Sequence, residues 1–81
     1  MSHHDSAARL TQIRLLIAEH FSMDEIRGLI FDLGIQPDTV AGNGSTSAAM
    51  ELVAYCERRG LLDTLIQLCQ GQRPHAPWPV L

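Results

Sequence analysis

The stretch from Phe21 to Ile35 limits the fold most, because it carries signals for both ends of one short helix. Ser22 is a favourable N-cap, and Glu25 three residues later completes a capping box that satisfies two backbone N–H groups. Gly34 can adopt the left-handed conformation that ends a helix, so Ile35 can turn back onto the preceding turn. Between these ends, five apolar residues recur at helical spacing: Met23, Ile26, Leu29, Ile30 and Leu33. This stretch therefore predicts a short helix with one buried face, and it contains no catalytic pattern.

Three more helices are predicted around it. The first runs from about Ser6, a plausible cap, to His20, and Leu15 points away from its apolar face. The third begins near Thr46 or Ser47 and ends at Gly60. The predicted core faces of these two helices contain Leu10, Ile13, Leu16 and Ile17, and Ala49, Leu52, Val53 and Cys56.

The fourth helix follows Gly60 at once and ends at Gly71, while Pro37 and Asp38 open one short helical turn. No alternating strand pattern and no internal repeat occurs in the sequence. The fold class is therefore all-α: a small antiparallel helical bundle of four main helices plus one or two short turns.

The chain divides into one domain and two tails. Its 81 residues suffice for a single small core. We expect a flexible N-terminal tail at 1–5, the helical domain at 6–72 and a Pro-rich segment at 73–81, which holds three of the four prolines. That segment should be extended. It is interpreted as a linker toward another domain, with Trp78 at least partly anchored on the bundle.

Charge and hydropathy exclude several function classes. The net charge is −3, all six basic residues are arginine, and a nucleic-acid or anionic-membrane surface needs a basic face. No apolar run is long enough to span a bilayer, and no signal peptide precedes the domain. We therefore expect a cytoplasmic protein with no nucleic-acid or membrane partner. A helix-turn-helix-like nucleic-acid module remains the alternative, because the sharp corner at Phe21–Ser22 permits one.

No residue set indicates catalysis, a cofactor or a metal. Cys56 and Cys69 lie in apolar helical patterns and are expected to be reduced core cysteines. The four histidines do not share the paired spacing of zinc ligands with these cysteines. The glycine-rich turn near Gly42 lacks the lysine and the preceding strand of a phosphate-binding loop. We expect no catalytic residue, no cofactor and no metal site.

The distribution of charge is more informative. Asp24, Glu25 and Asp32 lie on the second predicted helix, whereas Arg58 and Arg59 end the third. The negative charge of Asp32 in the last turn is unfavourable next to the C-terminal end of the helix dipole. A residue that breaks such a local rule often contacts a partner. One interpretation is a salt bridge from Asp32 to Arg58 or Arg59 within the fold. The other is an acidic patch that meets a basic patch on another molecule, head to tail if the patches lie on different faces.

Four segments have an order and spacing that are found together in one family. They are Phe21–Arg27, Phe31–Ile35, Glu51–Gly60 and Arg73–Pro74. Through these segments the chain resembles the bacterial effector-associated domains over about residues 9–74. The combination of Phe31–Gly34 with Glu51–Gly60 is the specific part of the resemblance. Many members carry a basic residue just before the Glu-Leu-Val segment, but this chain has none from Ser45 to Met50, so no basic patch is expected there.

The resemblance implies a death-like adaptor domain. Such domains are fused to caspase-like or trypsin-like proteases, STAND-type NTPases or other effectors in bacterial signalling and conflict systems. Like domains on two proteins pair and recruit the effector to a sensor. The implied partner is thus a like domain on another chain, a weak homo-oligomer is allowed, and the expected contact residues are Asp24, Glu25, Asp32, Arg58 and Arg59.

Overall fold

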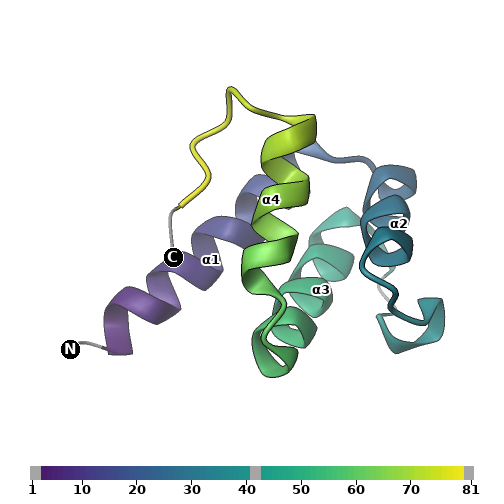
Figure 1. The fold of residues 1–81 in the computed structure, drawn as a ribbon, viewed down its shortest axis with the longest axis horizontal. Coiled ribbons are helices and arrows are strands. Elements are labelled where there is room, and N and C mark those ends of the chain that lie inside the picture. Colours follow the sequence, from purple (N-terminus) through teal and green to yellow (C-terminus); the bar gives the residue numbers. More distant parts are fainter. Residues whose placement is uncertain (1–2, 41–42, 80–81) are drawn as a thin grey trace.

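The computed structural model describes residues 3–40 and 43–79, which form four α-helices and one short 3-10 turn. The helices are α1 (His3–His20), α2 (Met23–Asp32), α3 (Ser45–Arg59) and α4 (Leu62–Gln72), and the 3-10 turn η1 is Pro37–Thr39 (Figure 1). No strand occurs in the described ranges. The prediction of a small all-helical bundle is confirmed.

Helix α3 lies at the centre of the bundle and contacts α1, α2 and α4. It runs opposite to α4 after a tight turn at Gly60–Leu61 (Figure 1). The core is filled by the apolar faces that helical spacing predicts, and its fully buried large side chains come from all four helices: Ile13, Ile17, Ile26, Leu29, Leu52, Cys56, Leu65 and Cys69. Each helix thus contributes one stripe to a single core.

Both predicted ends of α2 are confirmed. The Glu25 N–H donates to Ser22 Oγ (3.2 Å), and the Ser22 N–H donates to Glu25 Oε1 (2.9 Å), so the capping box is complete. Gly34 has φ +74°, and the Ile35 N–H donates to the Ile30 carbonyl (3.0 Å). Gly34 and Ile35 end the helix, because the left-handed conformation of Gly34 lets the chain turn back onto the last turn of α2.

Three helix boundaries differ from the expected ones. Helix α1 begins at His3, so Ser6 lies within the helix and does not cap it. The good helix formers Ala7 and Ala8 favour this earlier start. Of the expected flexible tail 1–5, residues 3–5 are helical, and Met1 and Ser2 lie outside the described residues.

The other two differences are smaller. Helix α3 begins at Ser45, one residue before the expected range. Helix α4 passes through Gly71, which keeps a negative φ, and ends at Gln72, because the Arg73 N–H still donates to the Cys69 carbonyl (2.8 Å). Gly71 is therefore not the helix stop.

The segment 73–79 contains no helix and returns from the end of α4 toward α1 (Figure 1). Trp78 is only 7% exposed, which confirms the expected anchoring of this side chain. The interpretation of the segment as a linker stays a prediction. Within the described residues, no helix combines the length and the apolar character that crossing a bilayer requires.

Candidate functional site

Glu25, one of the expected contact residues, is bonded to other residues of its own molecule. Besides the capping box, its Oε2 accepts a 2.6 Å ion-paired hydrogen bond from the Arg73 guanidinium. The hydrogen bond from the Ser22 backbone, followed by the bond from Arg73, lowers the pKa of the Glu25 carboxyl below its ordinary value. Glu25 therefore joins the start of α2 to the end of α4, and its first role is structural.

Arg73 is the centre of a clasp that sequence reasoning missed. Its Nε donates to the His20 carbonyl (3.1 Å), and its guanidinium lies over the Phe21 ring at 4.7 Å from the centroid. The Arg73 carbonyl in turn accepts the Trp78 indole N–H (2.8 Å), and the Trp78 ring lies 6.1 Å from the Phe21 ring. We call Phe21, Glu25, Arg73 and Trp78 the tail clasp. It fixes the Pro-rich segment over the corner between α1 and α2.

The remaining acidic residues of α2 face solvent. Asp24 forms an exposed ion pair with Arg27 (3.0 Å), which contributes little to stability. Asp32 is exposed at the end of the helix. Among the described residues the ion pairs are Arg27–Asp24 and Arg73–Glu25, so the salt bridge considered between Asp32 and Arg58 or Arg59 is not formed. The negative charge of Asp32 is left for solvent or for another molecule.

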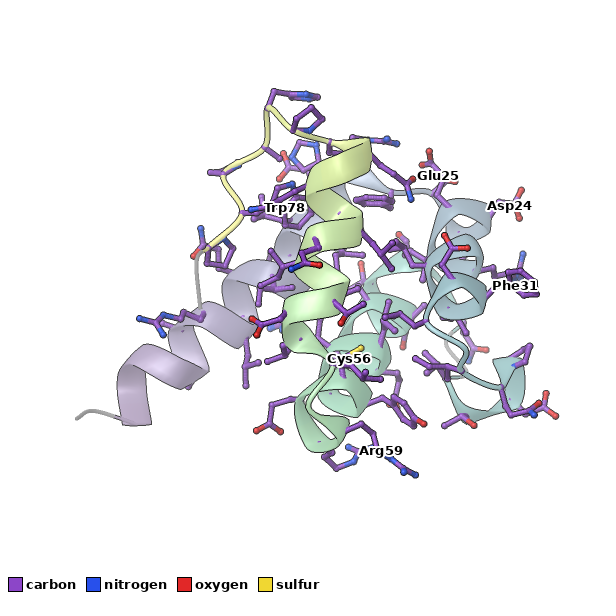
Figure 2. All side chains as sticks on the ribbon, in the orientation of Figure 1. Asp24, Glu25, Phe31, Cys56, Arg59 and Trp78 are labelled. Atoms are coloured by element: carbon purple, nitrogen blue, oxygen red, sulfur yellow. The ribbon has the colours of Figure 1, made fainter. Side chains whose placement is uncertain are left out.

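The two arginines that end α3 are exposed but differ in surroundings. The Arg59 guanidinium lies 5.3 Å from the centroid of the Tyr55 ring, a cation–π arrangement within its own helix. Arg58 follows Ala54 by four residues and therefore lies one turn further along the same side of α3, where it is exposed. Figure 2 shows Arg59 at the end of α3, away from Asp24 at the start of α2. The acidic and basic sets thus lie on different elements.

Phe31 is a surface residue for which the sequence predicted no role. It is 81% exposed, the highest value among the exposed large apolar side chains. Phe31 and Asp24 both point outward from α2 (Figure 2). The signal was present in the sequence, since Phe31 falls on the side of the helix opposite the stripe of Ile26 and Ile30.

Two of the hollows on the described surface involve α1. One, of about 520 Å³, is an open depression along one side of α1 that includes Leu15. The other, of about 200 Å³, lies between α1 and α3 and is lined in part by Leu10, Arg14, Met50, Val53, Ala54 and Glu57. We call the second hollow the α1–α3 groove. Its floor is apolar, and its rim carries one positive and one negative side chain.

The cysteines do not form a reactive site. Both are free and buried. Burial raises the pKa of Cys56 to about 11, and burial with the neighbouring Cys56 thiol raises the pKa of Cys69 to about 12. Both thiols are therefore protonated near neutral pH and are poor nucleophiles. Among the described residues no group of three or more histidine, cysteine or acidic side chains could hold a metal ion.

Comparison with known protein families gives a match over most of this chain. The family model for effector-associated domain 7 matches residues 13–74, well over half of the chain. Searches of curated proteins and of solved structures found no significant match. The matched range begins within α1, covers α2, α3 and α4, and ends at Pro74, before Trp78 of the tail clasp. The chain therefore belongs to the effector-associated domain 7 family.

Proposed function

We propose that this domain is a non-catalytic adaptor that recruits or couples an effector, such as a protease or a STAND-type NTPase, in a bacterial signalling or conflict system. It does so by pairing with a like, death-like domain on another chain. Family membership over residues 13–74 supports the adaptor role, because effector-associated domains accompany an effector and do not themselves catalyse. The observation that carries the pairing is the segregation of exposed acidic and basic residues on different helices.

The contact surfaces are the acidic side of α2 and the basic end of α3. Asp24 and Asp32 supply the exposed acidic charges, with Glu25 behind them in the tail clasp, and Arg58 and Arg59 supply the basic charges. Because the two sets lie on different elements, one molecule can present its acidic side to the basic end of the next. Weak pairing of this kind becomes effective when the domains are linked to larger proteins.

The experiment is size-exclusion chromatography coupled to light scattering over a range of protein and salt concentrations. We expect the average mass to rise with protein concentration at low salt and to fall as salt screens the charges. Asp32→Arg and Arg58→Glu should each weaken association with unchanged helicity, and the double exchange should recover part of it. Glu19→Arg, an exposed reversal on α1, is the matched control. An average mass that changes neither with salt concentration nor with these charge reversals would contradict charged pairing of like domains.

A further inference from the structure

Phe31 is placed where an exposed aromatic ring is unfavourable for an isolated domain. Single apolar residues on a surface are common, but a phenylalanine at 81% exposure on the polar side of an amphipathic helix leaves most of its apolar area in water. The preceding turn of α2 contains a second residue that is unfavourable for the stability of the helix. Gly28 lies three residues before Phe31 on the same side of α2, and glycine inside a helix destabilises it relative to alanine. Neither residue serves the core of its own molecule.

The glycine leaves space beside the ring. Apart from its two chain neighbours and the backbone of its own helix, a Cβ at Gly28 would meet no heavy atom within 4 Å, so the surface next to Phe31 is open. Asp24 and Arg27, paired at 3.0 Å, border the same side, and Asp32 follows Phe31 directly. We call Asp24, Arg27, Gly28, Phe31 and Asp32 the Phe31 face. It consists of one protruding ring, a flat position beside it and a border of charge.

The α1–α3 groove has the complementary properties. Leu10, Met50, Val53 and Ala54 provide an apolar lining, and a hollow of about 200 Å³ exceeds the roughly 150 Å³ of an engineered cavity that accepts benzene. Met50 is 47% exposed at this groove, so its side chain is accessible to an incoming ring. The hollow along α1 is larger but is an open side of one helix, and it offers a ring no second wall.

We infer that Phe31 of one molecule inserts into the α1–α3 groove of a second copy of this chain. This inference rests on the proposed adaptor function and names the surfaces of the pairing. The charges agree with it: Asp32 beside Phe31 can meet Arg14 at the groove, and Arg27 can meet Glu57. An acidic and a basic side chain beside the ring thus face a basic and an acidic side chain at the rim of the groove.

The geometry makes the contact intermolecular. Phe31 points outward from α2 (Figure 2), and α2 contributes no lining residue to the groove. The ring therefore cannot fill the groove of its own molecule. Since ring and groove are different patches, the contact is heterologous, and each bound pair still presents one free ring and one free groove. A chain of copies can grow from such contacts, or a like domain can end it.

The test uses one variant for each patch. Phe31→Ser removes the ring and leaves the groove intact, whereas Met50→Glu places a charge in the groove and leaves the ring intact. Both positions are exposed, so far-UV circular dichroism and the unfolding midpoint should match the unmodified protein. Leu15→Ser is the control, because Leu15 is 51% exposed and lies outside both patches.

Self-association is measured by sedimentation equilibrium up to millimolar concentration. We expect Phe31→Ser and Met50→Glu each to weaken it by about thirtyfold, the effect of truncating an aromatic anchor, and Leu15→Ser to leave it unchanged. The decisive step is to mix the two variants. Phe31→Ser offers a working groove and Met50→Glu offers a working ring, so the mixture should form a heterodimer of nearly unmodified affinity that grows no further.

Three results would overturn the inference. They are association unaffected by Phe31→Ser, a mixture of the two variants that forms no heterodimer, and an unmodified protein that stays monomeric at millimolar concentration. If Phe31→Ser has no effect but Asp32→Arg weakens a salt-sensitive association, the ring and groove are wrong and charged pairing stands. If the unmodified protein stays monomeric, the second copy is wrong, and a like domain on a different chain is still compatible with the adaptor function.

Discussion

The tail clasp should carry a large share of the stability of this domain, and Trp78→Ala measures that share. Trp78 is only 7% exposed and packs against Phe21. Its indole N–H donates a hydrogen bond to the Arg73 carbonyl. Truncation of a buried Trp to Ala costs about 3–5 kcal/mol. Because Trp78 lies in a terminal segment that can collapse onto the gap, we expect the lower value, about 3 kcal/mol, of which the hydrogen bond supplies about 1 kcal/mol.

The loss is large relative to the whole. A domain of 81 residues has an unfolding free energy of roughly 4–12 kcal/mol, so the variant loses at least a quarter of it. In urea, with a slope of about 1.5 kcal/mol per molar, the unfolding midpoint should fall by about 2 M. Far-UV circular dichroism is the assay because the variant has no tryptophan. Trp78→Phe keeps a ring but not the donor and should lose roughly half as much.

In the unmodified protein, fluorescence of the single tryptophan should give the same midpoint as circular dichroism. A fluorescence transition at clearly lower urea would mean that the clasp opens as a separate unit before the helices unfold. If Trp78→Ala unfolds within about 0.5 kcal/mol of the unmodified protein, the clasp does not stabilise the bundle and the reasoning is refuted.

Two further predictions concern α2. Glu25→Gln keeps a side chain that can complete the capping box, but it loses the ion pair with Arg73. The pKa of Glu25 in the folded protein lies below its ordinary value of 4.5. The stabilisation that the carboxylate provides is therefore present above pH 4.5 and is lost as the pH falls through the lowered pKa. The urea midpoints of variant and unmodified protein should therefore differ at pH 7 and converge in acid, and a difference independent of pH would contradict the ion pair. Gly28→Ala, at a helical position where a Cβ meets nothing within 4 Å, should stabilise the domain by about 1 kcal/mol and raise the thermal midpoint by about 5 °C. If the Phe31 face binds another copy closely at Gly28, the same variant should weaken self-association, and unchanged association would show that no backbone approaches there.

Local signals determined how much of the fold was predictable. The ends of α2 follow from residues within a few positions of one another, Ser22 with Glu25 and Gly34 with Ile35, so their geometry could be stated in advance. The core faces follow from helical spacing for the same reason. Gly71 misled because a glycine ends a helix only where the chain turns into the left-handed conformation, and here the last backbone hydrogen bond extends to Arg73.

The candidate site was less predictable because its important contacts join distant parts of the chain. Arg73 reaches His20 and Glu25 across about fifty residues, and Gln12 reaches the Pro77 carbonyl across 65. No spacing rule connects such residues before the bundle is assembled. Phe31 is the opposite case, since its place off the apolar stripe was visible in the sequence, but whether the ring was covered by another helix required the tertiary structure.

The structure shows that two acidic residues of α2 have different contacts and therefore different expected roles. Glu25 and Asp32 both looked like contact acids, but Glu25 is bonded to Ser22 and Arg73 whereas Asp32 meets no arginine in the part of the chain that is described. A change at Glu25 should therefore act first on unfolding, and a change at Asp32 should act on association without altering unfolding. Because Glu25 bonds to Arg73 of the clasp whereas Phe31 points outward from α2 (Figure 2), one short helix can anchor the fold through one residue set and take part in the proposed pairing through another. Selection on partner choice can then change the Phe31 face without loosening the core.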